Sequence, residues 1–295
     1  MVRDRIAELK KQYENLKIGK TALLEMVEDA EVSESVYNSN AIENSTLSLK
    51  DTEKILLDME ISRSLNLREV YEAKNLARVV GYVRQKAAAT DLDRDVICLL
   101  HQMLIGGIDD KIAGRFRERG EFVRVGTHIA PAPERVAALV MDMLRDYASG
   151  QKNYFLDNIA EFHLRFENTH PFCDGNGRIG RVLINFQLQR LGFPPVILRY
   201  KDKQRYFSAI RSYDDAQRTQ AMEKQLALVL MESMHKRLAY LHGHTIVALS
   251  EFARKTKQPP QGLINMARRQ TIEAFREKGI WKIGLDPDGL PGLKA

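Results

Sequence analysis

The 295-residue chain lacks the features that mark several large classes of protein. It has only two cysteines, Cys98 and Cys173, which excludes a disulfide-stapled secreted scaffold and fits a reducing cytoplasm. No apolar run approaches the roughly 20 residues that span a bilayer. The charged start, residues 1–10, has no apolar signal region, and internal repeats and low-complexity segments are absent. We therefore expect a cytoplasmic protein that does not contact a membrane.

The composition is that of a globular protein with an uneven distribution of charge. Hydrophobic residues make up 44% and charged residues 28%, which excludes a disordered chain and is enough for a substantial core. The net charge is +6, and residues 251–295 hold nine Lys or Arg against five Asp or Glu. Most of the excess therefore lies in this tail, and the nearly neutral body is no electrostatic DNA clamp.

Apolar residues recur at three- and four-residue spacing along most of the chain, which is typical of helices. The clearest strand signal is the alternating stretch 121–126, followed by the turn-prone Ala130–Pro133. The sequence therefore predicts an all-α protein with one short hairpin. Beyond the N-terminal helical region, the predicted helices cover residues 67–86, 93–105, 134–148, 153–168, 176–191, 202–215 and 219–241.

The most informative segment is HPFCDGNGRIGR, residues 170–181. Pro171 disfavours helical geometry at His170, so one helix should end there and another begin after the glycines. The glycines then lie in a loop before a helix N-terminus, where unpaired N–H groups and the helix dipole favour an anion. Arg178 and Arg181 add permanent charges suited to phosphate oxygens.

Other interpretations of this segment compete. Gly175–Gly180 matches the dinucleotide pattern G-x-G-x-x-G, but no strand precedes it and no βαβ alternation surrounds it. His163, Glu167 and His170 could form a metal site on one helix face, although Pro171 takes His170 off that helix and no fourth ligand is evident. A plain capped helix start with surface arginines is the last alternative.

The segment resembles the signature of the Fic family, His-Pro-Phe-x-(Asp/Glu)-Gly-Asn-Gly-Arg-x-x-Arg, at every specified position. The resemblance implies a Fic-type helical bundle core over residues 95–215, after an N-terminal helical region over 1–94 and before a C-terminal extension over 216–295. Most members transfer AMP from ATP to a Ser, Thr or Tyr hydroxyl of a target protein. The resemblance thus implies a protein adenylyltransferase that uses ATP and Mg2+ or Mn2+, labels a target and itself, and releases pyrophosphate.

The same resemblance assigns residue roles. His170 would be the general base, and imidazole suits that role near neutral pH. Asp174 would hold the metal on the phosphates, which agrees with the preference of a hard cation for oxygen ligands. The remaining nucleotide-binding residues would form the anion hole (Gly175, Asn176, Gly177), the phosphate grip (Arg178, Arg181), the adjoining turn (Ile179, Gly180), the flap (Val123, Arg124, Val125, Gly126) and an aromatic pair beside the adenine (Tyr206, Phe207).

The stretch 121–128, with Pro131 and Pro133 after it, resembles the flap hairpin of the family. In relatives the flap aligns the backbone of the target by strand addition. The alternative is an ordinary surface hairpin. The aromatic pair Tyr206 and Phe207 likewise has an alternative as part of the helical core.

The stretch Ser39–Asn44 resembles the inhibitory motif of the family, (Ser/Thr)-x-x-x-Glu-(Gly/Asn). The resemblance implies that Glu43 pairs with Arg181, removes a γ-phosphate contact and leaves ATP bound unproductively. The alternative is a capping box made by Asn40 and Glu43 at a helix start. In some relatives the same glutamate supports hydrolytic removal of AMP, so a phosphodiesterase activity stays open.

The tail includes the stretch Met266–Trp281, in which the sequence predicts a basic amphipathic helix that ends before Gly279. With Gly279 and the apolar stretch after it, it resembles the second half of a winged helix. A winged helix would bind DNA and make the protein a DNA-binding regulator with a nucleotide-sensing Fic core. The alternative is a docking helix with a solvated basic face. The target and the oligomeric state, a homo-oligomer included, stay open.

Overall fold

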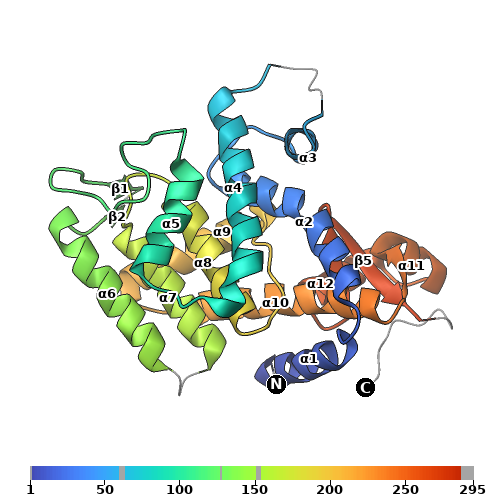
Figure 1. Cartoon of the computed structure of the whole chain (residues 1–295). Helices are drawn as coiled ribbons and strands as arrows, with labels where there is room; N and C mark the ends of the chain where they lie inside the picture. Colours follow the sequence, from blue (N-terminus) through green and yellow to red (C-terminus); the bar gives the residue numbers. More distant parts are fainter. Residues whose placement is uncertain (1, 60–63, 127, 151–153, 287–295) are drawn as a thin grey trace. The chain divides into compact units, whose positions relative to one another are not determined.

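The computed structural model describes residues 2–59, 64–126, 128–150 and 154–286 (Figure 1). It confirms the prediction of a mostly helical protein. The chain forms two compact units. The signature unit consists of Ser33–Phe193 and Ile197–Leu226, and the tail unit of Met1–Val32, Pro194–Val196 and Ala227–Ala295. The domain boundaries placed after residues 94 and 215 stay predictions.

The signature unit is a bundle of helices around α8 (Asn176–Arg190), which packs against α4, α5 and α7. Buried residues occur on all sides of α8, from Ile179 to Leu188, so this helix forms the centre of the core. The unit also includes the C-terminal part of α2 (Thr21–Ile42). Its other helices are α3 (Leu49–Leu56), α4 (Leu67–Lys86), α5 (Arg94–Ile105), α6 (Pro133–Ser149), α7 (Phe155–Thr169) and α9 (Lys203–Ala216), with short 3-10 turns at Ala87–Ala89 and Tyr200–Asp202.

Local sequence explains where several of these helices begin and end. Ser48 caps α3 in a capping box with Asp51, and the Asp93 side chain caps α5. α7 ends at His170, which takes a left-handed conformation with φ of 49° before Pro171. The prediction that Pro171 ends this helix is confirmed.

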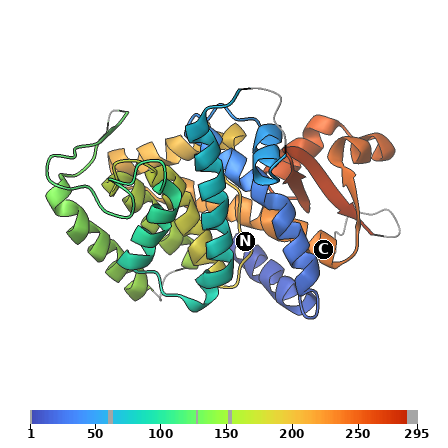
Figure 2. The same cartoon turned by 45° about the horizontal axis from the view of Figure 1, so that its top comes forward.

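The predicted hairpin is also present. β1 (Arg124–Val125) and β2 (His128–Ile129) pair antiparallel, with Arg124 opposite Ile129. They belong to the green segment that reaches out from the helices in Figure 2. We refer to residues 121–130 as the flap.

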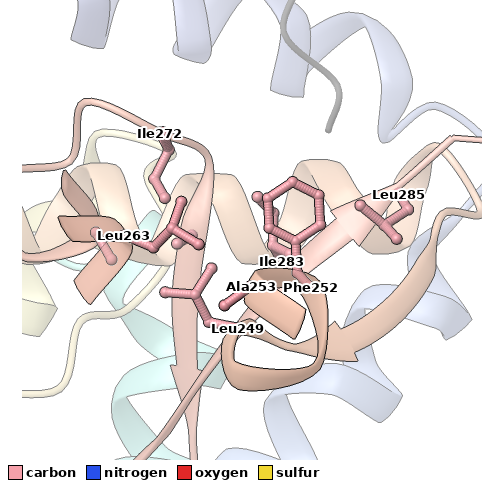
Figure 3. Close-up of a cluster of buried hydrophobic side chains, with 9 residues drawn as sticks. Leu249, Phe252, Ala253, Leu263, Ile272, Ile283 and Leu285 are labelled. Atoms are coloured by element: carbon pink, nitrogen blue, oxygen red, sulfur yellow. The ribbon is translucent and has the colours of Figure 1, made fainter. Parts of the chain in front are cut away.

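The tail unit combines helices with a small sheet. It includes α1 (Val2–Leu16) and most of α10 (Gln220–Leu241), followed by β3 (Thr245–Ala248), α11 (Leu249–Thr256), α12 (Pro260–Arg268), β4 (Ala274–Glu277) and β5 (Ile280–Leu285). The strands form an antiparallel sheet in the order β3-β5-β4. A hydrophobic core holds the helices to the sheet (Figure 3), and its buried members are Leu249, Phe252, Ala253, Leu263, Ala267, Ile272, Ala274, Ile283 and Leu285.

The sequence predicted a basic helix from about Met266 that ends before Gly279, and this prediction is wrong beyond Arg268. α12 ends at Arg268, and residues 274–277 form strand β4. The two-residue turn Lys278–Gly279, with φ of 49° and 77°, reverses the chain so that β4 pairs with β5. This pairing overrides the helical spacing of the basic residues, and the sequence analysis placed no strand in this segment.

Among the helices of the described residues, none has the length and hydrophobicity of a membrane span.

Candidate functional site

His170 lies at the end of α7, with its side chain half-buried. Its Nδ1 is 3.2 Å from the carbonyl oxygen of Glu167. Because a carbonyl only accepts, Nδ1 carries the proton in this contact and Nε2 keeps its lone pair. Burial lowers the pKa of His170, which favours the neutral imidazole. The ring is therefore set up to accept a proton at Nε2.

Arg117 holds this helix end in place. Its buried guanidinium donates to the carbonyl oxygens of His170 (2.8 Å), Thr169 (3.2 Å), Glu121 (3.0 Å) and Pro131 (2.9 Å). It thereby joins the end of α7 to the base of the flap. Sequence reasoning missed Arg117, because no local pattern distinguishes it from the arginines around it.

The loop between α7 and α8 is shaped by side chains that bind its backbone. Asn176 is 1% exposed, and its amide accepts from Phe172 N–H at 2.8 Å and donates to Phe172 C=O at 2.7 Å. His101 stacks on the Phe172 ring and accepts at Nδ1 from the N–H of Gly114 (2.9 Å), so its Nε2 donates to Asp174 C=O (3.0 Å). Burial lowers the pKa of His101 to about 4, so it stays neutral. The sequence did not identify His101.

The loop opens onto the N-terminus of α8. Gly175 is the N-cap, with φ of 78°, and a Cβ there would lie 3.1 Å from Leu104 and 3.2 Å from Ile105. Helical bonding starts with Ile179 N–H donating to Gly175 C=O at 2.9 Å. The N–H groups before Ile179 therefore belong to the open end of the helix, the arrangement that binds anions in many proteins. The predicted loop and helix start are confirmed.

Arg178 and Arg181 lie on the first turns of α8, with side chains 5% and 6% exposed. Arg178 pairs with Glu72 at 3.1 Å and with Asp174 at 3.2 Å. Among the described residues, the Nε of Arg178 and the Nη1 of Arg181 have no hydrogen-bond partner, although both atoms are buried. Buried donors without a partner are costly, and an anion at the helix end would supply one.

Glu43 lies over the anion loop and contacts Arg181. Arg181 Nη2 donates to Glu43 Oε1 at 2.8 Å and to the Ser39 carbonyl at 2.9 Å, while its Nε donates to Ser39 Oγ at 3.0 Å. A Cβ on Gly177 would lie 2.3 Å from the same Glu43 oxygen. Asn40 lies inside α2, so the capping-box interpretation is wrong. The segment Ser39–Asn44 ends a helix whose last turn faces the signature arginine.

Asp174 is held by arginines on both sides. Arg68 Nη2 is 2.5 Å from one carboxylate oxygen, and Arg178 Nη2 is 3.2 Å from the other. Arg68 also pairs with Glu72, one turn further along α4, at 3.1 Å. The carboxylate expected to hold a metal is thus paired with two arginines, and the sequence did not connect one of them, Arg68, with the site.

A buried polar cluster lies beneath α8. Tyr206 is 2% exposed, with its hydroxyl 2.8 Å from His163 Nε2 and 3.5 Å from Glu167 Oε1, and its ring faces the Arg181 guanidinium. Burial raises the pKa of Glu167 to about 8 and lowers that of His163 to about 3. Tyr206 thus belongs to the core, while Phe207 is half-buried and its role beside a base stays a prediction.

His163, Glu167 and His170 do not form the metal site that the sequence analysis considered as an alternative. His163 pairs with Tyr206 and His170 faces the carbonyl of Glu167. In the part of the chain that the structure describes, no three His, Cys, Asp or Glu side chains come together to hold a metal.

The flap carries large apolar side chains in solvent. Phe122 is 67% and Ile129 71% exposed. The flap is anchored by His128, whose Nε2 lies 2.9 Å from the carbonyl oxygen of Asn168 on α7. β1 and β2 pair only with each other in the described sheets, so each strand offers a free edge.

The helical bundle, the glycine loop and the two arginines at the start of α8 lie within the part of the chain that matches known proteins. Residues 91–188 match the Fic/DOC family. Among curated relatives, the chain is 31% identical over 211 residues to "Protein adenylyltransferase Fic" of Nematostella vectensis, covering 69% of this chain and 48% of the relative. It is 32% identical over 181 residues to "Protein adenylyltransferase fic-1" of Caenorhabditis elegans, covering 59% and 35%. The chain thus spans about half or less of these relatives.

Solved structures share the fold. A Fic domain containing signaling protein from Bacteroides thetaiotaomicron superposes with a TM-score of 0.74 at 24% identity, over 81% of this chain and 97% of that chain. Fic-1 from C. elegans superposes with a TM-score of 0.68 at 25% identity, over 80% of this chain and 71% of that chain. The prediction of a Fic-like fold is confirmed.

Proposed function

We propose that this protein is an autoinhibited protein adenylyltransferase, which transfers AMP from ATP to a Ser, Thr or Tyr hydroxyl of a target protein and of itself. The observation that carries the proposal is the pairing of a base with an anion site. His170 presents an unprotonated Nε2, and beyond the same short loop α8 presents its open end and two buried arginines. The names of the relatives support AMP transfer as the reaction.

In the proposed reaction, His170 Nε2 accepts the proton of the target hydroxyl. The hydroxyl oxygen forms a bond to the α-phosphorus of ATP while the bond from that phosphorus to the bridging oxygen breaks, and pyrophosphate leaves. Transfer of this kind depends mainly on positioning and charge stabilisation. Arg178 and Arg181 would hold the β- and γ-phosphates. The buried Nε of Arg178 and Nη1 of Arg181, which have no hydrogen-bond partner among the described residues, fit that role.

Asp174 fits a Mg2+ or Mn2+ ion that is held mainly by the triphosphate. Mg2+ keeps several waters and is bound by one or two carboxylates together with phosphate oxygens, so a lone carboxylate beside an anion site suits it. When bound, the cation would neutralise charge on the phosphates. Arg68 occupies this carboxylate in the free protein and would give it up.

The flap would position the target. Its free strand edges allow an extended peptide to add by backbone hydrogen bonds, and exposed Phe122 and Ile129 offer apolar contacts beside them. Arg117 ties the flap to His170, so the target backbone and the base would be held in one frame.

A direct test uses the purified chain and ATP labelled on either the α- or the γ-phosphate. AMP transfer predicts protein-bound label from the α-labelled form alone, in the Glu43→Gly background. Label from γ-ATP would identify a kinase, and no label from either form in Glu43→Gly would refute the transferase. His170→Ala in that background is the matched inactive control.

A second activity is favoured by the position of Glu43. Its carboxylate is 39% exposed and lies over Gly177, where it could orient a water as well as hold Arg181. Release of AMP from a pre-labelled protein by wild type, and its loss in Glu43→Gly, would identify an AMP-removing phosphodiesterase.

A further inference from the structure

Two short helices of the tail unit form a helix-turn-helix. α11 ends at Thr256, residues 257–259 make the turn, and α12 starts at Pro260. Lys257 closes α11 in a left-handed conformation with φ of 55°, and Pro260 opens α12 at its first position. A turn of three or four residues between two helices is typical of the helix-turn-helix of DNA-binding proteins.

The core of the tail unit determines which side of α12 faces outward. Leu263 and Ala267 are buried against the sheet and α11, as Figure 3 shows for Leu263. The opposite side therefore faces solvent. It carries a row of polar and basic side chains at helical spacing, which are Gln261, Asn265, Arg268 and Arg269.

These side chains are of the types that read base edges. Gln261 Nε2 lies 3.3 Å from Asn265 Oδ1, which shows that the two amides share one face. Asn and Gln pair with adenine and Arg pairs with guanine in the major groove, each through two hydrogen bonds. A surface that binds an acidic protein would need positive charge, but it would not need the side-chain amides of Gln261 and Asn265.

The charge around the helix-turn-helix has one sign. Residues 252–272 contain five basic side chains and no acidic one. Of the nearby carboxylates, Glu251 pairs with Lys255 at 2.9 Å and Glu277 with Lys236 and Lys282 at 3.1 and 2.6 Å. Glu273 is half-buried, and burial raises the pKa of its carboxyl group. The outer face therefore keeps a positive potential, which phosphates would satisfy.

The β4-β5 hairpin supplies a second contact. It follows α12 directly and reverses at Lys278 and Gly279, and Lys278 is exposed at the tip. Such a projecting basic turn next to an outward helix is suited to the phosphate backbone beside a groove.

We infer that the tail unit binds duplex DNA, with α12 in the major groove and the β4-β5 turn on the adjoining backbone. Gln261 and Asn265 read base edges, and Arg268 and Arg269 contact phosphates. This activity is additional to the proposed AMP transfer and does not depend on it. Through this binding the protein would recognise a particular DNA sequence.

The test measures binding of the full chain to a fluorescent 30-base-pair duplex by anisotropy over a series of salt concentrations. We expect Arg268→Ala/Arg269→Ala to weaken binding about tenfold or more and to lower the salt slope by about 2, since each lost phosphate contact removes about 0.9. Lys11→Ala/Lys86→Ala removes the same charge from exposed positions outside residues 245–286 and should bind as wild type does. Circular dichroism and thermal melting check that each variant is folded.

Recognition of the base sequence is tested separately, by selection of bound DNA from a pool of random duplexes. Wild type should enrich one site, and Gln261→Ala/Asn265→Ala should lose that preference while keeping the salt slope. Three results would overturn the inference. They are no duplex binding at 50 mM salt, equal loss in both charge variants, and tighter binding of single-stranded RNA or polyglutamate than of the duplex.

Discussion

Replacing Glu43 by glycine should release Arg181 and raise AMP transfer. In the free protein, Arg181 Nη2 donates to Glu43 Oε1 at 2.8 Å, and the guanidinium is nearly buried. A γ-phosphate competes for the same donors. Ser39 keeps two hydrogen bonds to Arg181 after the change, so the arginine stays positioned while its negative partner is gone.

The magnitude follows from the geometry of this pair. A hydrogen bond to a charged group contributes about 1.5–3 kcal/mol. Loss of this bond would change the equilibrium constant for the release of Arg181 from α2 by about 10- to 150-fold. Because the Glu43 side chain is 39% exposed, solvent screens the interaction, and we expect about a tenfold rise in labelling. Stability should fall by about 1 kcal/mol or less.

The assay is labelling of the chain itself by α-labelled ATP at equal amounts of folded protein. Glu43→Gln should reproduce most of the rise, whereas Glu25→Gln, an exposed change earlier on α2, should have no effect. Arg181→Ala in the Glu43→Gly background should lose the gain. Wild-type labelling as strong as that of Glu43→Gly would refute the inhibitory role and leave the transferase proposal without its switch.

The remaining predictions concern the base and the metal. His170→Ala should lower AMP transfer by at least about 100-fold with fold and ATP binding kept, and near wild-type transfer would remove the base assignment. Because burial lowers the pKa of His170 and the neutral ring is the base, wild-type transfer should fall at a lower pH than an unperturbed histidine, with a pKa of about 6.5, would give. Asp174→Ala should abolish metal-dependent transfer, and undiminished wild-type activity in excess chelator would contradict the metal assignment. Arg68→Ala should remove one of the two arginines that pair with Asp174 and tighten Mn2+ binding several-fold in a paramagnetic resonance titration without nucleotide, and unchanged affinity would show that Arg68 does not compete.

Much of the helical framework could be predicted because it depends on neighbours in sequence. Apolar spacing indicated α4 over Leu67–Lys86, and Pro171 marked the end of α7 because its ring restricts the residue before it. The glycine loop and the two arginines after it pointed to an anion site for the same reason. Their spacing places them on one helix end whatever surrounds it.

The same reasoning failed where a segment has two locally acceptable conformations. Asn40 and Glu43 have the spacing of a capping box, but α2 runs through Asn40 and ends at Ile42. Residues 274–277 belong to the stretch predicted as a basic amphipathic helix, yet they pair with β5 and become a strand. In both cases contacts with the rest of the chain decided between the alternatives.

By itself, then, the sequence determined the signature loop, the charge of the tail and the positions of most helices, because each depends on residues within a few turns of one another. The contact of Glu43 with Arg181, 138 positions later, was implied by a family resemblance and by no local pattern. Only the tertiary structure decided the geometry of that pair and that Arg68 closes on Asp174, 106 positions later. It also decided that Arg117 joins His170 to the flap. These contacts arise from the packing of α2 and α4 around α8 and of the flap on α7, and no local spacing encodes the distance between side chains on different helices.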